Sequence, residues 1–271
     1  MPSEVTGAIT RGDGSAPPTA DATVTIQANV TGTTAALTAA DLSFAFEIFD
    51  PKGASVYKGS ADVASGTAST SADLKAASLW EQPADNSPTA ALYTIVATLS
   101  DKDAVKDSVN VTFGIRKLKF DADKGFFLND KHVKVKGMCN HQDFAGVGTA
   151  VPDRIEDFRV AKLQSFGANA WRMSHNPPNP ELLNAADRRG LLVWDENRLF
   201  GDFATVIPPS LCFAALQNAF NHDAACLQWY TDQADMIKRD RNHPSIIWWS
   251  LCNEFGCVLS EANVTLEVRR F

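Results

Sequence analysis

Polar, titratable residues directly follow an apolar stretch at four places in the second half of the sequence. Carboxylate and imidazole groups in such positions can transfer protons or stabilise developing charge, which is the chemistry of general acid–base catalysis. Because a buried polar group costs free energy unless it has a partner, four such clusters favour one shared site over coincidence. The clusters are Asn140-His141-Gln142-Asp143, Arg172-Met173-Ser174-His175-Asn176, Asp195-Glu196-Asn197 and Asn253-Glu254.

Glu254 is the first candidate for a proton-transferring residue. It comes shortly after the apolar run from Ser245 to Leu251, which contains Trp248 and Trp249. A carboxyl group at the rim of an apolar strand can have a raised pKa and act as a general acid. The alternative is a structural ion pair, and the spacing alone does not separate the two interpretations.

The histidines His141 and His175 allow several interpretations. Each could bond substrate hydroxyl groups or stabilise developing charge, and each could also be a histidine with a purely structural partner. A metal site built from His141, Asp143, His175 and Glu254 is a further alternative. The sequence has no tight ligand spacing such as HExxH, so we predict no metal site. Asp195 and Glu196 either orient other groups or bond the backbone.

Strand-like and helix-like patterns alternate after Arg116. Pro180 suits the first turn of a helix, and Gly190 suits its end. The alternation predicts a parallel sheet, for which a (β/α)8 barrel is the commonest solution, with catalytic groups at the carboxyl ends of its strands. We expect strands at 133–138, 169–173, 191–194 and 245–251, and helices at 152–166, 179–190 and 224–239. In the first helix, Ile155, Phe158, Ala161 and Phe166 are expected on the buried face.

The first part of the sequence has a period of two instead. Val24, Ile26, Ala28 and Val30 alternate with polar residues, and similar runs surround 44–48, 93–99 and 109–115. Such alternation predicts half-buried antiparallel strands. We therefore predict an immunoglobulin-like β-sandwich over residues 1–117. Residues 118–271 are too few for a whole barrel of about 250 residues, so they form either its first half or a smaller open α/β domain.

Composition excludes some classes of partner. The formal net charge of −7 argues against nucleic acid and anionic membranes. No apolar run reaches the roughly 18 residues of a membrane span. The start, MPSEVTGAIT, has neither a basic region nor an apolar core, so no signal peptide is visible and a cytoplasmic location is favoured. Five cysteines without a CxxC pair argue against a disulfide framework or a zinc site.

The segment from Asn242 to Glu254, with the sequence NHPSIIWWSLCNE, resembles the acid/base signature of glycoside hydrolase family 2. Leu79-Trp80 with Leu92-Tyr93-Thr94 resembles the sandwich signature of that family, and Phe113-Gly114-Ile115-Arg116 resembles its junction between sandwich and barrel. The strand ends at 137–143, 172–178 and 195–197 resemble those of its first three barrel strands. The resemblance therefore spans residues 22–257.

This resemblance implies a retaining glycosidase, most similar to the β-galactosidase branch, with β-glucuronidase and β-mannosidase branches as alternatives. Glu254 would be the general acid/base, and Asn253 would bond the 2-hydroxyl of the sugar. No cofactor is required, although some relatives use a divalent cation near the site. A carbohydrate is the expected partner, and the complete enzyme could be a homo-oligomer. Further substrate-binding residues would be His141, Asp143, His175, Asn176 and Asn197.

The sequence also departs from the family pattern. The family nucleophile is a second glutamate on the seventh barrel strand, and this sequence stops shortly after the fourth. Glu261 and Glu267 do not follow a strand at the right place, so neither is assigned as the nucleophile. We therefore expect the isolated chain to be inactive and, because the fourth strand would leave an apolar edge, poorly soluble. The alternatives are a non-catalytic carbohydrate-binding protein and a fragment that is active only with a complementing chain.

Overall fold

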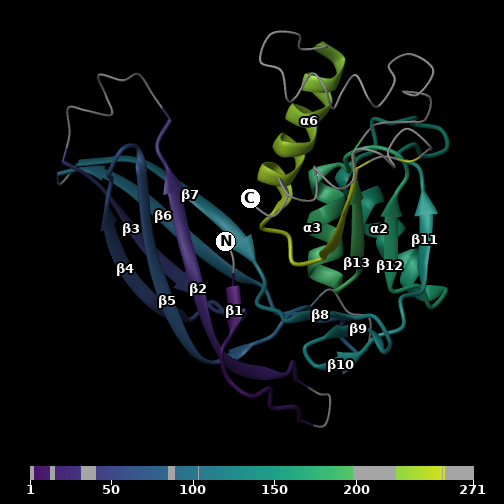
Figure 1. Cartoon of the computed structure of the whole chain (residues 1–271), viewed down its shortest axis with the longest axis horizontal. Coiled ribbons are helices and arrows are strands. Elements are labelled where there is room, and N and C mark those ends of the chain that lie inside the picture. Colours follow the sequence, from purple (N-terminus) through teal and green to yellow (C-terminus); the bar gives the residue numbers. More distant parts are fainter. Residues whose placement is uncertain are drawn as a thin grey trace. The chain divides into compact units, whose positions relative to one another are not determined.

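The computed structural model describes residues 3–12, 16–31, 41–84, 89–102, 104–197, 224–251 and 253. Element labels follow Figure 1. The chain forms two compact units. The sandwich unit contains Met1–Val135 with two short later segments, Asp187–Gly190 and Asn242–Pro244, and the barrel unit contains the remainder.

The sandwich unit consists of antiparallel sheets, as the period of two predicted. One sheet has the order β1 (Ser3–Val5), β2 (Thr19–Asn29), β5 (Thr67–Ser78). The other has the order β4 (Ser55–Asp62), β3 (Leu42–Phe49), β6 (Tyr93–Asp101), β7 (Ala104–Phe113). The sequence analysis did not identify β4 and β5, because these strands consist largely of Ala, Ser, Thr and Lys and lack a strong apolar alternation.

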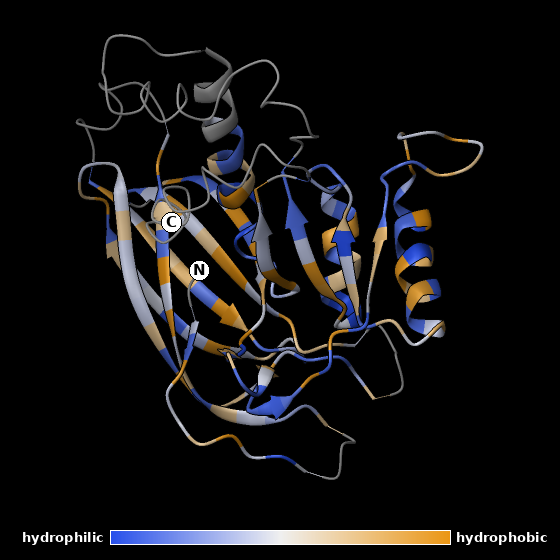
Figure 2. Ribbon diagram, turned by 45° about the vertical axis from the view of Figure 1, so that its right-hand side comes forward, coloured by the Kyte–Doolittle hydropathy of each residue, from blue (hydrophilic) through white to orange (hydrophobic). Residues whose placement is uncertain are grey.

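Alternate residues of these strands form the core of the sandwich unit. Val24 and Ile26 on β2 and Phe46 and Ile48 on β3 are at most 2% exposed. Figure 2 shows the corresponding hydrophobic and hydrophilic bands along the strands. Complete burial of such a side chain contributes about 1.5–3 kcal/mol, so this alternation is the main driving force for the sandwich.

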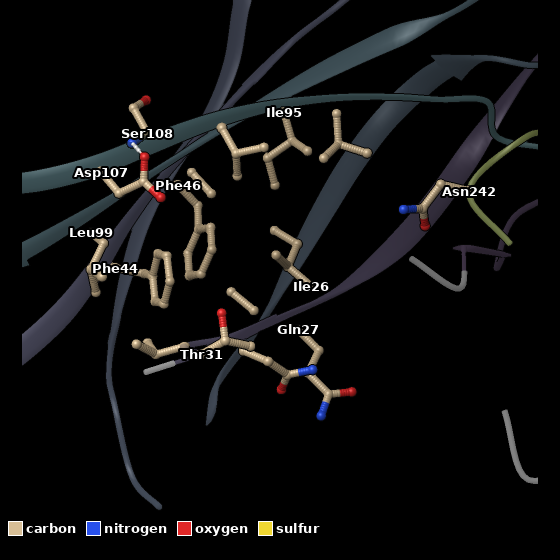
Figure 3. A pocket seen from close by; sticks show the side chains of 16 residues that line it. Ile26, Gln27, Thr31, Phe44, Phe46, Ile95, Leu99, Asp107, Ser108 and Asn242 are labelled. Carbon is tan, nitrogen blue, oxygen red and sulfur yellow. Dashed lines mark hydrogen bonds between the residues drawn. The ribbon is translucent and has the colours of Figure 1, made fainter. Parts of the chain in front are cut away.

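A pocket of about 260 Å³ lies between the two sheets of the sandwich unit. Figure 3 shows Phe44 and Phe46 on β3 lying across the pocket from Ile26 on β2. At its rim, the backbone N–H of Ser108 donates a 2.8 Å hydrogen bond to Asp107 Oδ1. The lining is mainly apolar, so this pocket does not present the convergent polar groups expected of a catalytic site.

Three short strands follow the sandwich sheets: β8 (Leu118–Asp121), β9 (Gly125–Leu128) and β10 (Lys131–His132). Asn129 and Asp130, with φ angles of 51° and 61°, form the two-residue turn between β9 and β10. Positive φ at both positions is typical of a tight hairpin turn. The predicted strand at 133–138 was wrong in its position, because this hairpin occupies the chain up to His132 and the next strand begins at Gly137.

The barrel unit contains a parallel sheet in which the described strands follow chain order. These strands are β11 (Gly137–Asn140), β12 (Ala170–Met173), β13 (Leu192–Glu196) and β14 (Ile246–Ser250). The helices α2 (Asp153–Ser165), α3 (Pro180–Arg189) and α6 (Ala224–Asp240) connect them. This arrangement is the first half of a (β/α)8 barrel, as predicted.

Helix α2 has the predicted extent, but a different face of it is buried. Phe158 and Phe166, which were expected in the core, are 51% and 72% exposed. The buried positions are instead Glu156, Val160 and Gln164. These residues are four apart and therefore lie on one helical face. The expectation was wrong because it took apolar residues as the only buried ones, whereas Glu156 is buried with an ionic partner.

Helix α3 has both predicted ends. The Asn179 side-chain oxygen accepts a 3.0 Å hydrogen bond from the backbone N–H of Glu181, which caps the first turn. Gly190 has a φ of +68° and ends the helix. Leu183 on this helix is fully buried in the core that includes Trp171 and Val193. Among the described residues, no helix combines the length and the apolar character that crossing a membrane requires.

Candidate active site

The register of the parallel sheet places one residue of each strand side by side. Arg172 on β12 pairs with Trp194 on β13, which pairs with Trp248 on β14. The neighbouring residues Trp171 and Val193 point to the helix side and are buried. Since successive residues of a strand face opposite sides, Arg172, Trp194 and Trp248 lie on the other, inner face. The sequence therefore places an arginine and two tryptophans on the face that lines a barrel.

Contacts between these inner-face side chains hold Arg172 in place. Its guanidinium carbon lies 5.3 Å from the centre of the Trp194 ring. Trp194 in turn contacts Trp248 edge-on, with ring centres 5.5 Å apart. A cation over an indole face is attracted by the ring's electron density. Trp194 remains 40% exposed, so part of this aromatic surface is open to a ligand.

Glu196 is the buried centre of a hydrogen-bond network at the strand ends. It is 0% exposed. Arg172 donates through Nε at 2.8 Å and approaches the same carboxylate oxygen through Nη2 at 2.7 Å. Ser250 Oγ donates at 2.9 Å, and His175 Nδ1 lies 2.5 Å from the other oxygen. A carboxylate with this many partners is satisfied although no water reaches it.

The electrostatic balance around Arg172 favours its charged form. Burial on its own would lower the pKa of Arg172, but the hydrogen bond and the negative charge of Glu196 outweigh burial and raise it. Arg172 is therefore a permanent cation beside a buried anion. Breaking one member of such a pair leaves an uncompensated buried charge, which is costly.

Asn253 is attached to this network. Arg172 Nη2 donates a 3.0 Å hydrogen bond to Asn253 Oδ1. This hydrogen bond fixes which way the amide group faces, because only the oxygen of an amide can accept. The predicted sugar-binding residue Asn253 is therefore oriented by Arg172, and Arg172 is oriented by Glu196.

The two predicted histidines come together at the strand ends. The rings of His141 and His175 lie 5.4 Å apart, edge to face at 85°. His141 is exposed, whereas the His175 side chain is 14% exposed and bonded to Glu196. The peptide bond between Ser174 and His175 is cis. The structure thus places His141, His175 and Asn253 around one network that includes Arg172 and Glu196.

Three other predicted residues have different surroundings. Asp143 is exposed, and among the described residues no contact joins it to the network. The Asn176 amide donates locally to the Pro177 carbonyl at 2.7 Å. Asn197 is fully buried at the end of β13, where its backbone N–H donates to the Ser250 carbonyl at 3.1 Å. Their predicted contact with substrate stays a prediction.

Glu254, the predicted acid/base, lies outside the described residues, as do Glu261 and Glu267. The structure therefore does not test these three assignments. Within the described parts of the chain, no group of three or more His, Cys, Asp or Glu side chains could hold a metal ion. The alternative metal set included Glu254, so a divalent cation at this site is also untested.

The residues that the sequence analysis failed to assign are Arg172 and Glu196. Arg172 was noted at a strand end without a role, and Glu196 was left as either an orienting residue or a backbone partner. One signal could have identified the pair, because an arginine inside the apolar run Ala170–Met173 must find a buried anion. The sequence does not specify which acidic residue is that partner.

Asp195, next to Glu196, belongs to a different pair on the helix side of the sheet. Asp195 and Asp240 are both 0% exposed. Burial raises the pKa of Asp195 well above its ordinary value, and the charge and hydrogen bond of Asp240 raise it further. Arg239 contacts both oxygens of Asp240 at 2.6 Å. Burial and the neighbouring Asp240 therefore both disfavour the charged form of the Asp195 carboxyl group.

The sequence matches two family models. Residues 15–116 match "Glycosyl hydrolases family 2", and residues 121–268 match "Glycosyl hydrolases family 2, TIM barrel domain". The chain belongs to glycosyl hydrolase family 2. The order of the two matches is the order of the sandwich and of the half-barrel in this family 2 chain.

Relatives of this family 2 chain include named glycosidases. It is 37% identical over 164 residues to the β-galactosidase BoGH2A of Bacteroides ovatus. The matched region covers 60% of this chain and 18% of that protein. The chain is 32% identical over 164 residues to a β-glucuronidase of Bacteroides fragilis, covering 60% of this chain and 22% of that protein. The chain thus spans about a fifth of the length of these curated relatives.

The fold is also similar to solved structures. A β-glycosidase from Bacteroides vulgatus superimposes with a TM-score of 0.71 at 27% identity. The superposition covers 98% of this chain and 32% of that enzyme. An immunoglobulin-like sandwich followed by part of a TIM barrel is therefore the architecture of this family 2 chain.

Proposed function

We propose that this chain provides the acid/base side of the active site of a retaining glycoside hydrolase of β-galactosidase type. The observation that carries the proposal is the chain of contacts from Glu196 through Arg172 to Asn253, because it orients an amide directly before Glu254. β-Glucuronides and β-mannosides are the alternative substrates, and the first of these also fits the β-glucuronidase among the relatives.

The proposed mechanism is double displacement. Glu254 protonates the leaving glycosidic oxygen while a carboxylate nucleophile attacks the anomeric carbon and forms a covalent glycosyl-enzyme. Glu254 then removes a proton from the incoming water, which releases the sugar with its original anomeric configuration. Retention requires two carboxyl groups about 5–5.5 Å apart. We assign the nucleophile to no residue of this chain and expect turnover only where another segment supplies it.

The described residues have binding and orienting roles in this proposal. Asn253 bonds the 2-hydroxyl of the sugar, an interaction that strengthens in the transition state. His141 and His175 line the subsite for the terminal sugar, and Trp194 offers an apolar surface to a pyranose ring. Proton transfer and nucleophilic attack need no cofactor, while a divalent cation near the site is compatible with the proposal.

The decisive experiment uses the full-length native protein that contains this sequence. It is assayed with nitrophenyl β-galactoside, β-glucuronide and β-mannoside, and then as the Glu254→Ala variant with and without azide. General acid–base catalysis contributes about 10²–10⁴-fold, so we expect a loss of that size for substrates with poor leaving groups. Substrates with activated leaving groups are expected to regain turnover with azide, which replaces the activated water. An unchanged rate in Glu254→Ala would contradict the assignment.

A non-catalytic carbohydrate-binding role is the second candidate, and the exposed inner-face ring of Trp194 favours it. Binding of galactose to the isolated chain separates the two candidates when it is measured by calorimetry. A binding protein retains its affinity in Glu254→Gln and shows no turnover on adding the remaining barrel segment. A complementing fragment gains turnover on mixing, and the gain depends on Glu254.

A further inference from the structure

We infer that Arg159 on α2 is a positioning residue for His141. It holds the backbone that follows β11 and so sets where the His141 ring stands in the sugar subsite. The inference rests on the proposed function for the role of His141. The clamp itself rests only on the contacts that Arg159 makes within the barrel unit.

Arg159 bonds two successive carbonyl groups of the segment after β11. Its Nη2 donates to the His141 carbonyl, and its Nη1 donates to the Gln142 carbonyl at 3.2 Å. The planar guanidinium group carries donors in a fixed fork, so it can hold both carbonyls at once. The position of the backbone at His141 is therefore tied to helix α2.

The guanidinium group is itself fixed from two further sides. Nη1 also lies 3.2 Å from Glu156 Oε2, one helical turn earlier. The guanidinium carbon lies 4.8 Å from the centre of the buried Trp171 ring. The Arg159 side chain is 11% exposed and that of Glu156 is 3% exposed, so the pair is shielded from solvent. The Arg159 guanidinium group therefore has little conformational freedom, and it holds the loop at a fixed position relative to α2.

The segment that Arg159 holds has little packing of its own. Residues 141–150 are all exposed except the half-buried Phe144. Phe144 and Gly148 bond each other's backbone, which closes a turn within the segment. Next to the segment lies a hollow of about 280 Å³, lined by His141, Gln142, Arg159 and Trp171 among others. Close packing does not fix the start of this loop, and the Arg159 hydrogen bonds take that role.

The contact between His141 and His175 links the clamp to the site. Their rings lie 5.4 Å apart, and His175 is bonded to the buried Glu196. Two independent supports, Arg159 through the backbone and His175 through the ring, therefore define the position of His141. A displacement of about 1 Å in a binding group can cost on the order of a hundredfold in rate. Loss of Arg159 should thus act on sugar binding before it acts on proton transfer.

The test compares three variants of the full-length protein. Arg159→Met keeps an unbranched side chain over Trp171 and removes all donors, whereas Arg159→Lys keeps one charge without the fork. Arg154→Met is the matched control, because Arg154 is an exposed arginine on the same helix. Hydrogen exchange of residues 141–150 and of strand β12 is measured for each, together with kcat and KM for the best nitrophenyl glycoside.

We expect Arg159→Met to speed exchange at 141–150 by at least about tenfold while β12 exchanges as before, since only local fluctuations increase. KM should rise about tenfold with kcat changed less than threefold, Arg159→Lys should lie between, and Arg154→Met should match the native protein. Unchanged exchange at 141–150, or equal acceleration throughout the barrel unit, would overturn the clamp. A native protein without glycosidase activity would refute the proposed function instead, and the exchange measurement would still decide the clamp.

Discussion

At the residue scale, the site depends on a buried carboxylate that is not itself proposed to react. Glu196 bonds Arg172, His175 and Ser250, and through Arg172 it orients Asn253. The contribution of Glu196 to stability therefore comes from compensating the charge of the partly exposed Arg172 as much as from its own hydrogen bonds. This predicts that Glu196 affects both stability and catalysis, although it does not contact the reacting atoms in the proposed mechanism.

Replacing Glu196 by alanine should destabilise the barrel unit by about 1–3 kcal/mol, because Arg172, whose side chain is only 23% exposed, then loses its charged partner. Urea unfolding followed by tryptophan fluorescence measures this loss. Asp123→Ala, in an exposed turn, is the control and should change stability by less than about 0.5 kcal/mol. Equal effects of the two substitutions would show that the Glu196 network contributes no stability.

The raised pKa of Asp195 predicts that the stability of the fold depends on pH. Its pKa is raised in the folded protein above the ordinary value of 3.8, so between these two values the folded state binds more protons than the unfolded state. Stability contributed by this group is therefore present at low pH and is lost as pH rises through that interval. Asp195→Asn removes the titration and can still donate a hydrogen bond to Asp240.

The melting temperatures of the native protein and of Asp195→Asn should therefore converge at acidic pH. At pH 8 the variant should be the more stable of the two. Thermal unfolding followed by circular dichroism from pH 4.5 to pH 8 gives this comparison. Parallel curves over the whole range would mean that Asp195 titrates as it does in the unfolded chain.

At the element scale, helix α2 shows that the extent of a helix and its buried face are separate predictions. The helix lies where its pattern predicted it, yet Glu156, Val160 and Gln164 face inward instead of the expected aromatic stripe. Of its inward polar residues, Glu156 is bonded to Arg159. The Nζ atom of Lys162 lies over the exposed Phe158 ring, 5.9 Å from the ring centre.

Alanine substitutions separate the observed core from the expected one. Leu183→Ala on α3 removes a fully buried side chain and should cost about 2–5 kcal/mol. Phe158→Ala on α2 removes a ring that is half exposed and should change stability by about 0.5 kcal/mol or less. Urea unfolding of both variants provides the comparison. A large loss of stability in Phe158→Ala would show that Phe158 is buried, as the sequence analysis expected.

At the scale of the whole molecule, the inner face of the sheet in the barrel unit carries exposed aromatic surface beside its polar network. Within the described residues β14 pairs with β13 alone, and the inner-face ring of Trp194 is 40% exposed. Exposed apolar edges and faces promote association between chains. The exposed aromatic surface therefore favours self-association of the isolated polypeptide.

The 271-residue chain by itself is therefore expected to self-associate at micromolar concentration and to show no turnover. Sedimentation velocity over a range of concentrations measures the association, and the nitrophenyl glycosides measure turnover. Trp194→Lys places a charge on the inner face and should shift the distribution towards monomer. A monodisperse, active monomer would contradict both expectations.

The sequence by itself determined the period of each part, and with it the sandwich, the parallel sheet and the position of the polar clusters at strand ends. These properties are local, because the side-chain period of a strand or helix follows from backbone geometry alone. The residues at the two ends of α3, Asn179 and Gly190, could be predicted for the same reason.

Only the tertiary structure decided which partners meet. The ion pair between Arg172 and Glu196 depends on the pairing of β12 with β13. The hydrogen bond from Arg159 to the His141 carbonyl depends on how α2 packs. The buried side of α2 likewise follows from packing, since Glu156 is buried where Arg159 bonds it. Such pairings join residues far apart in the sequence, and the periodicity of a single segment does not encode them.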